Sequence, residues 1–414
     1  MARMSKKRKS PAGPTSKRKI TPKAKSRPRP KIITRPAPVE SPESYLPLPR
    51  PRVQPQLFSE RRRLEANFEF ALKSPKVSVV VVNFDGVDLL WNCLFALKTQ
   101  TYPPFEIILV DNASSDASVP FVKANYPQVT ILECDENFGY AMGCNLGVKT
   151  ATGDLVVLLN NDAVLTPDCL SRMVKEFQEG WPDLGALAGT VTAKQVVEGS
   201  KPSSFLVPNF LGNWVEGHLA EANEVFYPEG CAFLYARFLA AEGPFDPDYF
   251  IYQEDFYFGW RLRLEGKGVA RSRNAKVFHD EGGTMSRSAD WKVVYYKTRN
   301  RWLNLFLFYS AANLLKVLPW IALEAFWRLA KGLFTGFDLF AGTLLAILWI
   351  LTHPGSVLRK RLEAQGRRKL SDEQVLLFSG RVARDGGFLS RSLNFISLLY
   401  CAVVGLPVME SRPD

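Results

Sequence analysis

The sequence predicts an α/β protein built around a mostly parallel sheet with helices on both faces. Two observations predict this fold class. From residue 76 onward, segments with the pattern of strands alternate with segments with the pattern of helices, and such alternation is typical of a parallel sheet covered on both sides. Polar residues also follow the strand segments, which is where open parallel sheets bind their ligands.

The first strand is the valine-rich run Val77–Val82, whose composition is that of a strand buried on both faces. The elements expected next are a helix at Leu89–Thr99, a strand at Glu106–Val110, a helix at Ser114–Asn125, a strand at Thr130–Leu132, a helix at Gly139–Thr150 and a strand at Leu155–Leu159. Thr166-Pro167 predicts the start of another helix, because Thr is a good N-cap and Pro fits the first turn. The rest is less regular, with elements expected at Phe226–Tyr235 (strand), Asp255–Glu265 (helix) and Val269–Phe278 (strand).

Composition divides the chain into four segments, which are 1–55, 56–75, 76–301 and 302–414. The first is rich in Pro, Lys, Arg and Ser and is expected to be disordered. Residues 1–53 hold 16 of the 53 Lys and Arg residues and 2 of the 41 Asp and Glu residues, so they carry a net charge of +14 and the rest of the chain −2. We therefore expect no specific nucleic-acid binding by the folded part. The tail either contacts anionic lipid or nucleic acid or has no specific partner. The segment 56–75 is expected to be a linker or helix.

The six cysteines form no CxxC pair and no cluster with histidine. A zinc site is therefore not expected, and scattered thiols suit a reducing compartment. The basic N-terminus is not followed by an apolar segment, so no secretory signal is expected.

Three apolar segments follow residue 301, at Leu303–Leu323, Leu339–Thr352 and Ser392–Met409. A spanning helix needs roughly 20 apolar residues; the first two segments are short or interrupted, and only the last is near that length. With the basic stretch Arg359 to Lys369 between them, they suit interfacial or re-entrant helices. We expect 302–414 to associate with a membrane; the alternative is a helical subdomain packed on the α/β domain.

Three polar clusters have the residue types of an active site. Asp111, at a strand end, is placed to accept hydrogen bonds from a base or ribose, although its surroundings are also a good turn and helix cap. Asp162 of Asn160-Asn161-Asp162 offers a hard oxygen ligand for Mg²⁺ or Mn²⁺, or caps a polar turn. Glu254-Asp255 lies between aromatic residues, as expected of a desolvated carboxylate that takes a proton, or of acids at a helix N-terminus.

Taken together, these pieces resemble the family 2 inverting glycosyltransferases of the GT-A fold, and most of all their rhamnosyltransferase-like branch. The resemblance covers about 76–300 and rests on the following residues in order: Val77 to Asn83, Gln100-Thr101-Tyr102-Pro103, Val110 to Asp116, Glu136 to Ala141, Asn160-Asn161-Asp162, Gly243-Pro244-Phe245-Asp246, Glu254-Asp255, His279 and Arg299-Asn300. No part of the tail matches.

The resemblance implies a role for each matching position. Asp255 would be the catalytic base, with Glu254 beside it, and Asp162 and His279 would hold Mg²⁺ or Mn²⁺. The residues implied for binding the nucleotide-sugar are Asn83, Asp111, Asn112, Asp116, Asn137, Gly139, Asn160, Asn161 and Gly230. Asn160 replaces the first Asp of the Asp-x-Asp metal motif, which puts metal dependence in doubt. Phe256 and Tyr257 stand where many relatives have a third acid, so no role for that acid carries over.

The function implied is transfer of one sugar, with inversion, from dTDP-rhamnose or a UDP-sugar to a lipid-linked saccharide or other glycan in cell-surface polysaccharide synthesis. Its expected place is the cytoplasmic face of the inner or plasma membrane. A processive synthase is disfavoured because Thr298-Arg299-Asn300-Arg301-Trp302 lacks the Gln of Gln-x-x-Arg-Trp. A non-catalytic membrane or nucleic-acid adaptor on the same fold is the other alternative. A dinucleotide oxidoreductase and a P-loop NTPase are excluded, because Gly-x-Gly-x-x-Gly does not follow the first strand and Gly-Lys-Ser/Thr is missing.

Overall fold

The computed structural model describes residues 64–103, 105–192, 206–216, 223–279, 290–376, 378–384 and 386–411. The chain divides into two units, Met1–Pro55 and Gln56–Asp414, and all described residues belong to the second. The basic tail predicted at 1–55 therefore lies outside the described residues. Within the predicted linker or helix at 56–75, residues 64–71 are helical.

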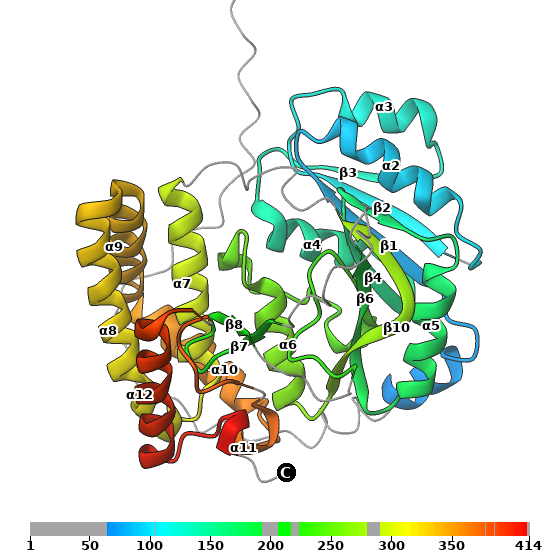
Figure 1. The fold of residues 1–414 in the computed structure, drawn as a ribbon. Helices are drawn as coiled ribbons and strands as arrows, with labels where there is room; N and C mark the ends of the chain where they lie inside the picture. The colour runs from blue at the N-terminus through cyan, green and yellow to red at the C-terminus, as the bar shows by residue number, and fades with distance from the viewer. Residues whose placement is uncertain are drawn as a thin grey trace, which may run out of the picture. The chain divides into compact units, whose positions relative to one another are not determined.

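An eight-stranded sheet forms the centre of the α/β region, with the strand order β3-β2-β1-β4-β9-β6-β10-β5. Its strands are β1 (Val77–Asn83), β2 (Phe105–Asp111), β3 (Thr130–Glu133), β4 (Leu155–Asn160), β5 (Ala163–Leu165), β6 (Leu184–Thr192), β9 (Ala232–Ala236) and β10 (Gly268–His279). β9 pairs antiparallel with β4 and β6, and β5 pairs antiparallel with β10, while the other pairs are parallel. The predicted mostly parallel α/β sheet is confirmed (Figure 1).

Helices cover both faces of this sheet, as the sequence predicts. One core cluster packs α2 (Val87–Lys98), α3 (Ser118–Asn125) and α5 (Cys169–Gly180) on the sheet. The other packs α4 (Gly139–Thr150) and α6 (Glu254–Leu264) on the opposite face, and α7 (Trp291–Phe308) joins this cluster by packing against α6. The alternation along β1 explains the two cores, because Val79 and Val81 belong to the first and Val80 and Val82 to the second.

Three elements begin later than the sequence predicts. The helix expected from Thr166-Pro167 begins at Cys169, because the Thr166 amide donates to Lys276 O and so continues the pairing of β5 with β10. α3 begins at Ser118 and not at Ser114, because residues 114–117 form the loop held by Asp111 and Asp85. The strand expected from Phe226 begins only at Ala232. A separate two-stranded sheet pairs β7 (Leu206–Pro208) with β8 (Trp214–Glu216).

The chain after α7 is helical. It contains α8 (Ala311–Thr335), α9 (Phe337–Thr352), α10 (Pro354–Gly366), α11 (Asp372–Val375) and α12 (Phe388–Val404). The predicted apolar segment Leu303–Leu323 is divided between α7 and α8, because Ser310 caps α8 by accepting a hydrogen bond from the Asn313 amide. The boundary expected between residues 301 and 302 falls inside α7.

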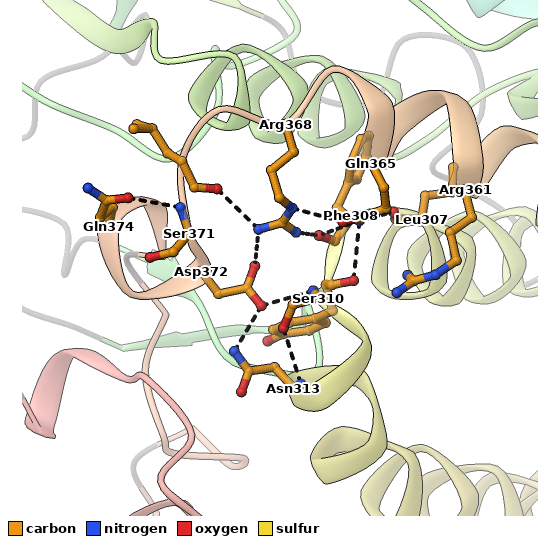
Figure 2. Close-up of polar contacts among 12 residues, drawn as sticks. Leu307, Phe308, Ser310, Asn313, Arg361, Gln365, Arg368, Ser371, Asp372 and Gln374 are labelled. Atoms are coloured by element: carbon orange, nitrogen blue, oxygen red, sulfur yellow. Dashed lines mark hydrogen bonds and ion pairs between the residues drawn. The ribbon is translucent and has the colours of Figure 1, made fainter. Parts of the chain in front are cut away.

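The junction between α7 and α8 is closed by side chains of α10, of α11 and of the segment between them (Figure 2). The carbonyl groups at the end of α7 need donors, and Gln365 Nε2 reaches Phe308 O at 3.1 Å while Arg368 also donates to that oxygen. The start of α8 attracts an anion, and the buried Asp372 carboxylate accepts from Ser310 N at 2.9 Å. Arg368 Nη1 lies 2.8 Å from Asp372 Oδ1, so one ion pair joins both helix ends.

The C-terminal helices share a core with the α/β region. The cluster that contains α4 and α6 also includes Val317 of α8, Ala346 of α9, Phe378 and Cys401 of α12. Within the described residues, no single helix combines the length and hydropathy of a membrane span; α9 and α10 reach them only when counted together, across a bend of 77°.

Candidate active site

Three polar residues stand side by side where the central parallel strands end. Asn83 pairs in register with Asp111, and the neighbouring Val82 pairs with Asn160. The expectation that these side chains would gather at the carboxyl edge of the sheet is confirmed. The parallel order β2-β1-β4 is what brings them together.

The carboxylate of Asp111 is buried, and only one of its two oxygens accepts a hydrogen bond. Its Oδ2 accepts from the Ser114 amide at 3.0 Å, while Oδ1 has no hydrogen-bond partner. Leaving a buried carboxylate oxygen unpaired costs free energy, so a ligand donor is its natural partner. Asp116 differs, because its carboxylate accepts from Val87 N at 3.0 Å and Ser118 N at 2.9 Å. Partial burial raises its pKa, yet these bonds lower it on balance, and they tie together the starts of α2 and α3.

The asparagine side chains of the predicted nucleotide site mainly form hydrogen bonds that fix neighbouring loops. Asn112 Oδ1 accepts from Phe138 N at 3.0 Å, and its Nδ2 donates to Asn137 Oδ1 and Gly139 O, each at 3.0 Å. Gly139 has a φ of +81°, and a Cβ there would lie 2.5 Å from Phe250 O, so only glycine fits this close approach. These residues therefore fix the start of α4 against the segment that leads into α6.

A second pair of amides joins β1 to the turn after β4. Asn161 Nδ2 donates to Asn83 Oδ1 at 2.8 Å, and Asn83 Nδ2 donates to Ser114 Oγ at 3.2 Å. Both asparagines are buried. They bring the turn that carries Asp162 next to the loop that follows Asp111.

Asp162 and His279 meet across the sheet edge. His279 ends β10 opposite Ala163 of β5, and its Nε2 lies 3.2 Å from Asp162 Oδ1. Asn160 Oδ1 is buried without a hydrogen-bond partner, and the buried Asp162 Oδ1 has only the His279 ring beside it. Carboxylate and amide oxygens beside an imidazole are the donor types that Mg²⁺ and Mn²⁺ take, so these residues fit the predicted cation. Among the described residues, no three His, Cys, Asp or Glu side chains form a metal cluster, so water or substrate oxygens would complete the coordination.

A cavity of about 720 Å³ brings five predicted site residues together. They are Asn160, Gly230, Glu254, Asp255 and His279. The other predicted residues (Asn83, Asp111, Asn112, Asp116, Asn137, Gly139, Asn161 and Asp162) lie in the hydrogen-bonded strand-end loops described above and not in its lining. The cavity thus contains both candidate carboxylates of α6 and the His279 side of the candidate cation site.

Glu254 and Asp255 occupy the first turn of α6. Burial raises the pKa of Glu254, and the neighbouring Asp255 raises it further. Burial also raises the pKa of Asp255, with Glu229 contributing, although the Phe256 and Gly230 amides oppose this. Carboxylates with raised pKa values are suited to take a proton from a hydroxyl group.

The two oxygens of Asp255 have different surroundings. Oδ1 accepts from the Phe256 amide at 2.7 Å. Oδ2 faces Gly230, where a Cβ would lie 3.2 Å away. The missing side chain at Gly230 leaves room beside Oδ2 for a substrate group.

The backbone leading into Glu254 is strained and tightly held. Phe250, Tyr252 and Gln253 have φ values of +54°, +71° and +68°, a region that non-glycine residues rarely adopt. Asn300 Nδ2 donates to the carbonyl oxygens of Tyr249, Ile251 and Tyr252 at 2.8, 2.9 and 2.8 Å. Strain of this kind persists only where the surroundings fix it, so Asn300 sets the position of the Asp255 carboxylate.

Sequence reasoning missed the cationic wall of the cavity. Lys297, Thr298 and Arg301 of α7 and Arg328 of α8 line it. Lys297 Nζ lies 4.6 Å from the ring centre of Tyr252, which also lines it. The signal available was the presence of charged residues inside apolar helical segments, since buried charges of this kind are paired or functional.

Residues 78–243 match the family model described as Glycosyl transferase family 2. The chain carries a glycosyl transferase family 2 domain. The predicted family is confirmed, and the matched residues include Asp111 and Asn160. They end before Glu254, Asp255 and His279, so the roles of these three residues depend on the geometry above.

Named relatives agree with the family 2 domain. The chain is 28% identical to the uncharacterized glycosyltransferase YwdF of Bacillus subtilis over 54% of this chain and 82% of that protein. It is 30% identical to the O-antigen biosynthesis protein RfbC of Myxococcus xanthus over 52% of this chain, but spans only 18% of that protein. It is 24% identical to the O-antigen chain rhamnosyltransferase RfbN of Salmonella typhimurium over 50% of this chain and 68% of that protein. The domain and these homologues identify the chain as a glycosyltransferase (EC 2.4).

Among solved structures, a crystal structure of GalNAc-T7 with UDP, GalNAc and Mn²⁺ aligns with a TM-score of 0.48 at 14% identity, over 59% of this chain and 50% of that one. The crystal structure of Staphylococcus aureus TarS aligns with a TM-score of 0.46 at 17% identity, over 70% of this chain and 53% of that one.

Proposed function

We propose that the family 2 domain transfers one sugar from a nucleotide-sugar to a hydroxyl group of a lipid-linked saccharide or other glycan, with inversion, in cell-surface polysaccharide synthesis. The observation that carries this proposal is the Asp255 carboxylate, with a raised pKa, in the wall of a cavity that also contains Asn160 and His279. The names of RfbC and RfbN support a role in polysaccharide synthesis. The donor we propose is dTDP-rhamnose or a UDP-sugar.

In this reaction, Asp255 accepts the proton of the acceptor hydroxyl. The hydroxyl oxygen bonds to the anomeric carbon as the bond from that carbon to the nucleoside diphosphate breaks. The diphosphate leaves with the electron pair from the opposite face, and the configuration inverts. Asp111 Oδ1, buried and unpaired, accepts a hydrogen bond from the nucleoside. A divalent cation held by Asp162 and His279, with Asn160 beside it, would neutralise charge on the diphosphate.

We place this reaction at the cytoplasmic face of the inner or plasma membrane. All six cysteines are free thiols, which fits a reducing compartment. The apolar C-terminal helices and the basic tail supply contacts to a membrane surface, and we propose no specific nucleic-acid partner.

The test is a titration of the full chain, in mild detergent, with a panel of nucleotide-sugars, with and without Mg²⁺ or Mn²⁺. Thermal stabilisation and nucleotide release are measured. One donor class is expected to stabilise the protein, and Asp111→Ala is expected to lose most of that effect. Asp168→Ala is the matched control, because Asp168 precedes α5, pairs with Arg172 at the surface and lies outside the cavity lining.

If no nucleotide-sugar stabilises the protein under any metal condition, transfer is the wrong function and the non-catalytic adaptor becomes the alternative. The length of the product separates single transfer from processive synthesis. One added sugar per acceptor supports the proposal, and a ladder of products contradicts it.

A further inference from the structure

Helix α8 has its polar and apolar faces arranged opposite to those of an ordinary surface helix. Two of its charged residues, Glu324 and Arg328, face the protein, where Glu324 Oε1 lies 2.7 Å from Arg301 Nη2 and Arg328 Nη2 donates to Thr298 Oγ1 at 2.7 Å. Phe326, between them in sequence, is 70% exposed. A helix in contact with water normally buries its apolar stripe and exposes its charges. The outer side of α8 is therefore built for an apolar environment.

The two helices packed against α8 show the same arrangement. In α9 the buried residues are Gly342, Thr343 and Ala346, while the exposed large hydrophobic residues include Leu348 and Leu351. Small residues at helix contacts and large apolar residues outside are typical of helices packed in lipid.

In α12 the buried residues are polar or small, namely Asn394, Ser397 and Cys401. Phe395 and Val403 are exposed. Asn394 uses its side chain to bind the backbone of residues 382–383, so the polar inner side is fully engaged by protein.

The outer sides of these helices form most of the exposed apolar surface. Of the 26 exposed large hydrophobic residues among the described ones, 17 lie on α8, α9 and α12. The helices are in contact, because Tyr400 OH of α12 donates to Lys316 O of α8, and a Cβ at Gly332 of α8 would lie 2.5 Å from Phe340 N of α9. We call these 17 residues the apolar face; Figure 1 shows α8, α9 and α12 on the side of α7 away from the sheet. Such a concentration marks an interaction surface.

Charge distinguishes the possible occupants of the apolar face. Residues 311–409 contain 12 Lys and Arg residues against 6 Asp and Glu residues. Lys331, Arg359, Arg384 and Arg391 are exposed. A second copy of the chain would bring like charges together, whereas anionic lipid headgroups would neutralise them. Lys and Arg side chains are long enough to reach the headgroups while the apolar side chains next to them lie in the acyl region.

We propose that the apolar face is a docking surface for an anionic lipid bilayer and lies in the plane of one leaflet. The inner sides of α8, α9 and α12 stay bonded to the rest of the protein, so only their outer sides are available to lipid. Interfacial helices with one apolar side and cationic flanks bind in this way.

This surface rests on the proposed function and adds to it. α7 and α8 provide the cationic wall of the cavity through Lys297, Arg301 and Arg328, and the outer side of the same α8 belongs to the apolar face. Docking therefore brings the wall beside Asp255 to the membrane, where a lipid-linked acceptor presents its headgroup.

The test is flotation of the full chain with vesicles of phosphatidylcholine alone or mixed with phosphatidylglycerol. The variant carries Phe326→Glu and Trp327→Glu on α8. The matched control carries Trp91→Glu and Phe95→Glu on α2, which replaces one Phe and one Trp of similar exposure (53% and 55%, against 70% and 62% on α8). At about 1 M salt, where the Debye length is about 3 Å, the attraction of the basic tail and of the exposed cations of the C-terminal helices to anionic lipid is screened, so binding there reports the apolar contact.

At high salt we expect the wild type and the α2 variant to float with the mixed vesicles and the α8 variant to bind at least about tenfold more weakly. The proposal is overturned if the wild type does not float at high salt, or if both variants lose binding equally. It is also overturned if the wild type self-associates through α8 and ignores vesicles, since a second copy then covers the face. Donor stabilisation, measured on the same variants, is expected to stay unchanged. If no donor stabilises the wild type, the proposed function is contradicted, while the docking surface is unaffected.

Discussion

Replacing Asn300 by alanine removes the side chain that holds the strained backbone in front of Asp255. The contacts of Asn300 Nδ2 with the carbonyl oxygens of Tyr249, Ile251 and Tyr252 are lost, and so is the hydrogen bond that Arg299 Nε donates to Asn300 Oδ1. At about 1 kcal/mol each, and with water able to replace part of them at the half-buried positions, the free energy of unfolding should fall by about 2–3 kcal/mol.

The effect on catalysis should be larger than the effect on stability suggests. Phe250, Tyr252 and Gln253 each store on the order of 1–3 kcal/mol of backbone strain, and without Asn300 this segment can relax. A displacement of about 1 Å of a catalytic group costs roughly 100-fold in rate. We therefore expect Asn300→Ala to lower kcat about 100-fold and to leave donor affinity nearly unchanged.

Asn394→Ala is the matched control. Asn394 is also a buried asparagine that makes three hydrogen bonds to a loop backbone, at 3.0, 2.9 and 3.0 Å to residues 382–383, and it does not line the cavity. Both variants should lose similar stability in thermal unfolding, and only Asn300→Ala should lose turnover in a nucleotide-release assay. Equal losses of turnover in both, or normal turnover in Asn300→Ala, would refute the positioning role.

The remaining predictions concern three carboxylates, Asp255, Asp162 and Asp372. Asp255→Asn should lower turnover by roughly 10²–10⁴-fold while keeping donor stabilisation; near-normal turnover removes Asp255 as the base. Because the fold raises the pKa of Asp255, the acid limb of the turnover profile should lie above the ordinary carboxylate range. Folding favours the protonated form of Asp255, so the contribution of this group to the free energy of unfolding is lost as pH rises through its folded-state pKa. Asp255→Asn should therefore melt at a higher temperature than the wild type only at alkaline pH. Asp162→Asn should lose the metal-dependent part of donor stabilisation, and an unchanged Mn²⁺ response argues against this cation site. Asp372→Ala leaves Arg368 without its buried partner and should cost about 3–5 kcal/mol in denaturant unfolding without a matching loss of turnover per folded molecule; no loss of stability contradicts the role of this ion pair.

Local patterns predicted the elements whose neighbours are close in sequence. The run at Val77–Asn83, the helix Gly139–Thr150 and the helix Glu254–Leu264 were found within one or two residues, because each carries its own periodicity and turn residues. The start of α5 was misplaced, because Thr166 is held by Lys276, which is far away in the chain. β9 was misjudged in length, since its extent is set by antiparallel pairing with β4 and β6.

Some features of the candidate site could likewise be predicted from the sequence and others could not. Asn83, Asp111 and Asn160 could be predicted to meet, because parallel strands place their carboxyl ends at one edge. The positive φ angles of Tyr252 and Gln253 could not be predicted from the sequence, because long-range hydrogen bonds from Asn300 hold this segment.

The sequence by itself determined that this protein has βα units with polar residues at the strand ends, because strand and helix periodicities and turn residues are local properties of the chain. Only the tertiary structure decided that Asn160 of a strand end and the two carboxylates of α6 share a cavity, and that α7 and α8 wall it. It also decided that α8 turns Phe326 outward and Glu324 inward. The physical reason is that periodicity shows that a helix has an apolar side, whereas only packing decides whether that side is covered by protein or left for another partner.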